Sequence, residues 1–120
     1  RAHGREYDEL THLACQHPAD LYIAHHAQTL GAAYHAAKKY HARFAFDAED
    51  FHTGEFQDTD SVIVKRIEYL EKKYLPHCDY ITAASENIVQ ALAQKYSILK
   101  PETILNVFPL EYPNSEPRTP

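Results

Sequence analysis

The chain has 120 residues and a formal net charge of −5 at pH 7, with ordinary fractions of hydrophobic (44%) and charged (24%) residues. This length and balance predict one soluble globular domain that buries a core. The acidic residues are scattered, which argues against nucleic acid as the main partner because its phosphates need a basic surface. No apolar run approaches the roughly 18 residues of a membrane-spanning helix.

Two features of the composition bear on where the protein works and whether the sequence is whole. Cys15 and Cys78 lie far apart and have no CxxC spacing, which favours buried or idle thiols in a reducing cytoplasm. The sequence contains no methionine and begins with Arg1. We therefore expect it to be part of a longer protein.

In the first half of the chain, hydrophobic spacing predicts helices and strands in alternation. Apolar residues recur at helical spacing over 6–16, and Pro18 ends that helix. The apolar run 21–24 is typical of a strand that is covered on both sides. The Ala-rich segment 27–40 predicts a helix with two lysines in its last turn, where they suit the helix dipole. Residues 43–47 predict the second strand.

The second half of the chain continues this alternation. The polar, glycine-containing segment 53–59 predicts a surface loop, and 62–74 predicts an amphipathic helix with Glu68 one turn before Lys72. Three further elements are predicted: a strand over 79–83, a helix from Ser85 through Tyr96, and a strand over 103–107.

The order of these elements predicts an α/β fold, in which parallel strands are joined by crossover helices. Right-handed crossovers would give a three-layer, Rossmann-like parallel sheet. We expect residues 1–109 to form this domain. The proline-rich segment 110–120 is interpreted as a linker that leads out of it.

Polar side chains follow three of the predicted strands, and they are the candidate functional residues. Because the carboxyl ends of parallel strands meet at one edge of a sheet, we expect these side chains to line a ligand-binding cleft. Alternation places Asp47 and Glu49 on one side of the chain and Asp50 on the other. The candidates are His25 and His26 after the first strand, Asp47, Glu49, Asp50 and His52 after the second, and Ser85 and Glu86 after the third.

Each of these groups also has an ordinary structural interpretation. Histidines at a strand end can bond to neighbouring backbone, and an acidic loop can simply be solvated. Ser85 is a good helix cap, and Glu86 suits the positive end of a helix dipole. Imidazole and carboxylate groups suit zinc or manganese, but no HExxH or similar spacing is present, so no metal is predicted.

Several catalytic and phosphate-binding motifs are absent from the sequence. It contains no G-x-S-x-G elbow, no G-x-G-x-x-G loop and no Walker loop. The residues here therefore predict no dinucleotide or phosphate cradle and no bound cofactor.

The order of motifs from about residue 18 to residue 109 resembles the second half of the N-terminal domain of family 4 glycosyltransferases. These enzymes have the GT-B architecture, in which two Rossmann-like domains face each other across a cleft. The most specific parts are Asp47-Ala48-Glu49-Asp50 and the stretch from Leu75 to Glu86. The segments that carry the resemblance read DLYIAHH, FAFDAEDFHTGE, KRIEYLEKKYLPHCDYITAASENIVQALAQKY and ILNVFP.

The resemblance implies a retaining transfer of a sugar from a nucleotide-sugar donor to a sugar or glycolipid acceptor that lies against this domain. The family usually has Asp-Ala-His-Asp or Asp-Ala-His-Glu where this chain has Glu49 in the third place, with His52 two residues beyond Asp50. Acceptor-side cleft positions are implied, and no catalytic residue is assigned. The implied acceptor-side residues are His25, His26, Glu49, Asp50, His52, Ser85 and Glu86.

The same resemblance implies that the donor binds a C-terminal domain that follows residue 120. We therefore expect these residues alone to be inactive. Missing first strands would leave an exposed sheet edge, which favours self-association. The expected location is the cytoplasm, including the membrane periphery.

Two other classes of protein stay open. One is a metal-dependent hydrolase that would use His25, His26, Glu49, Asp50 and His52. The other is a non-catalytic α/β binding or signalling module, in which the acids near Asp47 would form a phospho-acceptor pocket. The sequence offers no suitably placed lysine after a late strand for such a pocket.

Overall fold

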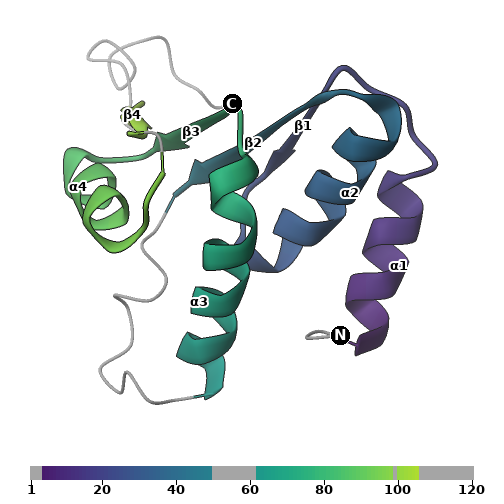
Figure 1. The fold of residues 1–120 in the computed structure, drawn as a ribbon, viewed down its shortest axis with the longest axis horizontal. Coiled ribbons are helices and arrows are strands. Elements are labelled where there is room, and N and C mark those ends of the chain that lie inside the picture. Colours follow the sequence, from purple (N-terminus) through teal and green to yellow (C-terminus); the bar gives the residue numbers. More distant parts are fainter. Residues whose placement is uncertain (1–3, 50–61, 99, 106–120) are drawn as a thin grey trace, which may run out of the picture.

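The structure, a computed structural model, describes residues 4–49, 62–98 and 100–105. Within them, one sheet has four parallel strands in the order β1-β2-β3-β4 (Figure 1). The strands are β1 (Leu21–Ala24), β2 (Arg43–Ala48), β3 (Tyr80–Ala83) and β4 (Glu102–Thr103). The helices are α1 (Gly4–Ala14), α2 (Leu30–Tyr40), α3 (Val62–Tyr74) and α4 (Glu86–Lys95), with 3-10 turns η1 (Ala27–Thr29) and η3 (Leu75–His77).

The all-parallel sheet with its crossover helices confirms the predicted α/β class and is compatible with a Rossmann-like fold. The predicted strand 103–107 is wrong in its extent, because β4 pairs only through Glu102 and Thr103. Ile104 adds one backbone hydrogen bond, to the Ala83 carbonyl at 2.8 Å, but lies outside the strand. The predicted loop 53–59 lies outside the described residues, as do residues 106 and 107.

The crossover helices α2, α3 and α4 cover the same face of the sheet, which we call the inner face. Strand order follows chain order, so right-handed crossovers return each helix to the same side. Figure 1 shows α2 and α3 on one side of the strands. Inner-face residues of β2 and β3 join helix residues in one continuous buried cluster, and they include Phe44, Phe46, Ala48, Ile81 and Ala83.

The opposite alternation of strand residues forms the outer face of the sheet. It consists of Leu21, Ile23, Arg43, Ala45, Asp47, Tyr80 and Thr82. A three-layer arrangement needs a helix on this face, and the described part of the chain places none there, since α1 packs on α2 instead. The outer face therefore stays partly exposed.

Small residues allow α2 to approach the sheet closely. Ala33, Ala36 and Ala37 are buried on this helix, and Leu30 at its start is fully buried.

Burial raises the pKa of the Cys78 thiol to about 12, so this thiol stays protonated at neutral pH. None of the described helices is both long and apolar enough to cross a membrane.

Candidate functional site

Four polar side chains meet at the carboxyl ends of β1, β2 and β3, and we call them the strand-end cluster: His25, Asp47, Glu49 and Thr82. The Thr82 hydroxyl donates to Asp47 Oδ1 at 2.7 Å. His25 Nδ1 lies 3.2 Å from Asp47 Oδ2 and 3.5 Å from Glu49 Oε2. One imidazole nitrogen therefore faces two carboxylates, one of which is anchored to the neighbouring strand.

The sheet brings these residues together through its register. Asp47 on β2 pairs directly with Thr82 on β3, and His25 follows the end of β1 beside them. Glu49 is two residues beyond Asp47, so it returns to the same side of an extended chain. This placement agrees with the alternation expected from the sequence, whereas Asp50 and His52 lie outside the described residues.

The arrangement can support two kinds of chemistry. Asp47 favours the His25 tautomer that carries a proton on Nδ1, which leaves Nε2 as a proton acceptor. Alternatively, one ligand atom from each of His25, Asp47 and Glu49 lies within 4.8 Å of the others, a spacing that a single metal ion can bridge. The side chains of His25, Asp47 and Glu49 are 53%, 33% and 50% exposed, so the cluster is open to a ligand.

A small hollow adjoins the strand-end cluster. Its volume is about 180 Å³, and it is lined by Asp47, Glu49, Ala84, Ile104 and Leu105. Pockets for drug-sized ligands usually enclose about 300–1,000 Å³. The hollow is therefore suited to one small polar group at the edge of the sheet.

Two of the predicted site residues, Ser85 and Glu86, have structural roles outside the strand-end cluster. The Ser85 hydroxyl oxygen accepts from the Ile88 backbone N–H at 3.3 Å, which caps α4. Glu86 accepts hydrogen bonds from Thr103 at 2.7 Å and from Gln90, and the bond from Thr103 lowers the pKa of the Glu86 carboxyl. These contacts tie α4 to its own start and to β4.

His26 also lies next to the strand-end cluster in sequence but opens a turn. Its backbone N–H donates to the Thr29 hydroxyl oxygen, and its carbonyl accepts from the same hydroxyl at 2.7 Å. These bonds fix the start of η1. Any acceptor-side role of His26, Ser85 or Glu86 stays a prediction.

The Cys78-Asp79 pair, part of the stretch that carries the family resemblance, has a structural role. Asp79 Oδ2 accepts from the Phe44 backbone N–H at 2.8 Å, and the Asp79 N–H donates to the Phe44 carbonyl at 2.6 Å. The carboxylate thus holds the start of β2 beside the entry to β3. These two hydrogen bonds help to fix the register of β2 against β3, a role that needs no ligand.

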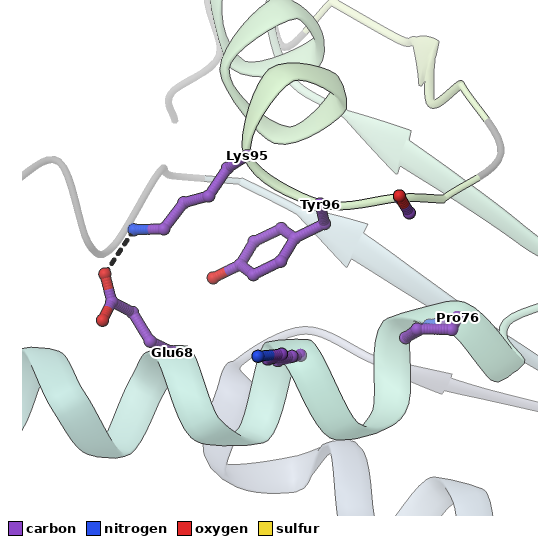
Figure 2. A pocket seen from close by; sticks show the side chains of 6 residues that line it. Glu68, Pro76, Lys95 and Tyr96 are labelled. Atoms are coloured by element: carbon purple, nitrogen blue, oxygen red, sulfur yellow. Dashed lines mark hydrogen bonds and ion pairs between the residues drawn. The ribbon is translucent and has the colours of Figure 1, made fainter.

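A larger hollow lies between α3 and the end of α4, and we call it the α3–α4 groove (Figure 2). Its volume is about 530 Å³. Because α4 runs back from the carboxyl end of β3, the groove is at the opposite end of the strands from the strand-end cluster. Its lining residues are Glu68, Lys72, Pro76, Lys95, Tyr96 and Ser97.

Charged and hydroxyl groups in and behind this groove bind one another. Lys95 Nζ lies 2.5 Å from Glu68 Oε2, the contact drawn in Figure 2. The Tyr96 hydroxyl donates to Glu71 Oε1 at 2.5 Å, and Glu71 is only 2% exposed. Burial and the bond to Glu71 raise the pKa of Tyr96 well above its ordinary value. We interpret these contacts as fastening α4 to α3.

Sequence reasoning missed one member of the strand-end cluster, Thr82. The residue sits in the middle of a predicted strand, and only its register opposite Asp47 reveals its role.

Neither protein-family models nor curated proteins give a match to this chain. The fold and the cluster together define an α/β protein with a Rossmann-like parallel sheet and a polar group at its carboxyl edge.

Proposed function

We propose that this chain supplies the acceptor side of a retaining glycosyltransferase of the GT-B type. The observation that carries the proposal is the convergence of His25 with Asp47 and Glu49 beside a small hollow. Ligands of open α/β sheets bind outside the carboxyl ends of the strands, where this cluster lies. The family resemblance of the sequence supplies the reaction type.

The side chains in the cluster suit a sugar hydroxyl. Ionised carboxylates accept hydrogen bonds from hydroxyls, and such charge-assisted bonds are about twice as strong as neutral ones. Asp47 is held by Thr82, so its position is fixed before a ligand arrives. His25 Nε2 and the remaining lone pairs of the two carboxylates offer several acceptors to neighbouring hydroxyls of one sugar ring.

In this proposal the donor is a nucleotide sugar that binds a second, C-terminal domain. The acceptor is a sugar or a glycolipid, and the sugar transfer takes place in the cytoplasm or at the membrane periphery. The sequence given has no phosphate-binding loop of its own. Transfer therefore needs both domains.

The first test is a titration of the isotope-labelled chain with a panel of neutral monosaccharides, followed by amide NMR spectra. We expect at least one sugar to shift the amides of His25, Asp47, Glu49 and Ala84 while the α3–α4 groove stays unchanged. Incubation of the same chain with nucleotide sugars is expected to give no transfer. If no sugar moves the cluster amides, the acceptor-side proposal is wrong, and turnover with a nucleotide sugar would refute the need for a second domain.

A metal-dependent hydrolase is the second candidate, favoured by the three ligand atoms within 4.8 Å of one another. The His25 imidazole and two carboxylates suit zinc or manganese, with solvent completing the coordination shell.

Isothermal titration with Zn²⁺ and Mn²⁺ tests this candidate. If it holds, the unmodified chain binds about one ion, His25→Ala loses at least tenfold in affinity, and His17→Ala does not. His17 is the matched control because it is exposed and, among the described residues, bonds only through its backbone: its N–H donates to the Ala14 carbonyl and its carbonyl accepts from the Tyr22 hydroxyl. A chain that binds neither ion eliminates the hydrolase candidate.

A further inference from the structure

The outer face of the sheet exposes an apolar row that the described helices do not cover. In this row Ile23, Ala45 and Tyr80 are register partners on three adjacent strands. Ile23 and Tyr80 are 44% and 38% exposed, and Leu21 is exposed beside them. Ala45, between them in the register, is itself fully buried. Neighbouring exposed apolar side chains such as these are typical of a surface that contacts another molecule.

An all-parallel sheet makes this exposure unusual. Parallel sheets occur almost only where both faces are covered, because their strands are apolar on both sides. The inner face is covered by α2, α3 and α4. The outer face therefore calls for a partner that presents a flat, apolar surface of its own.

Charge along β2 indicates which partner fits. Three successive outer-face positions read Arg43, Ala45 and Asp47, which is positive, neutral and negative along one strand. The charged ends are about 13 Å apart, at about 3.3 Å per residue. Arg43 is exposed, and its guanidinium pairs with no carboxylate in the part of the chain that the structure describes. A surface with this pattern is complementary to itself when turned by half a rotation.

We propose that the outer face binds a second copy of this chain, sheet against sheet, about a two-fold axis near Ala45. With strands antiparallel across the interface, Arg43 of each copy faces Asp47 of the other, and Ile23 and Tyr80 fill the centre. Two-fold interfaces of this kind use the same patch on both copies, and stacked sheets pack about 10 Å apart. The dimer does not rest on the proposed sugar transfer, but the two compete for one group, because Asp47 belongs to the strand-end cluster as well as to the outer face.

The experiment is sedimentation equilibrium of the full chain over a wide concentration range. We expect a reversible dimer that Ile23→Asp weakens at least tenfold. Leu13→Asp is the matched control, because Leu13 is an exposed apolar residue on α1, away from the sheet; it is expected to leave the dimer intact. A chain that stays monomeric at every concentration overturns the proposal and leaves this face to a different protein or segment.

A charge exchange tests the orientation without relying on one variant. Arg43→Glu and Asp47→Arg each place like charges opposite each other in both contacts of the dimer, so each variant alone is expected to be monomeric. Mixed in equal amounts, the two variants restore opposite charges in both contacts and are expected to form a heterodimer. A dimer that persists in each variant alone, or no heterodimer in the mixture, overturns the assigned surface.

Discussion

Replacing Tyr96 by phenylalanine is expected to lower the free energy of unfolding by about 2 kcal/mol, because it removes a donor from a buried carboxylate. Glu71 is 2% exposed and accepts the Tyr96 hydroxyl at 2.5 Å. A buried carboxylate that loses a donor bears more of its desolvation cost, whereas the phenyl ring itself still packs. Urea unfolding followed by circular dichroism measures the difference.

The same measurement has a matched control and a double variant. Tyr69→Phe removes a hydroxyl from an exposed ring on α3 and is expected to change stability by less than about 0.5 kcal/mol. Combining Tyr96→Phe with Glu71→Leu removes both partners of this bond, and the double variant is expected to lose less stability than the sum of the two single variants. If Tyr96→Phe is as mild as Tyr69→Phe, the bond does not fasten α4 to α3 as we infer.

The raised pKa of Tyr96 also gives this prediction a pH dependence. The unfolded phenol ionises near pH 10, while the folded phenol holds its proton to higher pH. Its contribution to stability is therefore complete below pH 10 and is lost as the pH rises beyond it. We expect the stability gap between the unmodified chain and Tyr96→Phe to narrow above pH 10.

Most of the strands and helices could be predicted from the sequence, because the spacing of apolar residues within one short segment is enough to indicate each of them. The end of β4 does not, since it depends on the length of its neighbour. Ile104 and Leu105 have strand-like side chains, yet both are more than 60% exposed. β3 ends at Ala83, paired with Thr103, and the chain then turns into α4. No strand residue remains beside Ile104, so pairing stops.

The number of layers is likewise a property of strand order, which spacing along the chain does not reveal. Consecutive order puts every crossover on one face, whereas a reversal in strand order would place helices on both. The apolar run 21–24 predicts a strand that is covered on both sides, but Leu21 and Ile23 on its outer face are 37% and 44% exposed. The cover on that face was therefore not predictable from apolar character alone.

The site was predictable where it depended on strand ends and unpredictable where it depended on register. His25 and Glu49 meet because their strands end at the same edge. Ser85 and Glu86 also come directly after a strand, the third. Their side-chain oxygens, however, accept hydrogen bonds from the Ile88 N–H at the start of α4 and from the Thr103 hydroxyl on β4. Their capping pattern was the signal that favoured the structural interpretation.

Asp47→Ala is expected to weaken sugar binding at the strand-end cluster by more than tenfold, which corresponds to about 1.4 kcal/mol or more. Among the described residues, Asp47 is the one that contacts both Thr82 and His25, so its loss removes an acceptor and leaves the imidazole with its longer contact to Glu49. NMR titration with the sugar that shifts the cluster amides measures the change.

Thr82→Val separates position from charge, because the carboxylate stays while its anchor is lost. Its expected effect is smaller, a few-fold loss of affinity, since an unanchored Asp47 must be ordered when the sugar binds. Asp20→Ala is the matched control, because it is the same substitution at an exposed position before β1. Among the described residues, Asp20 bonds only through its backbone carbonyl, which accepts from the Arg43 N–H. This variant is expected to bind sugar normally. Equal affinity in Asp47→Ala and Asp20→Ala, with both chains folded, would place the acceptor away from this cluster.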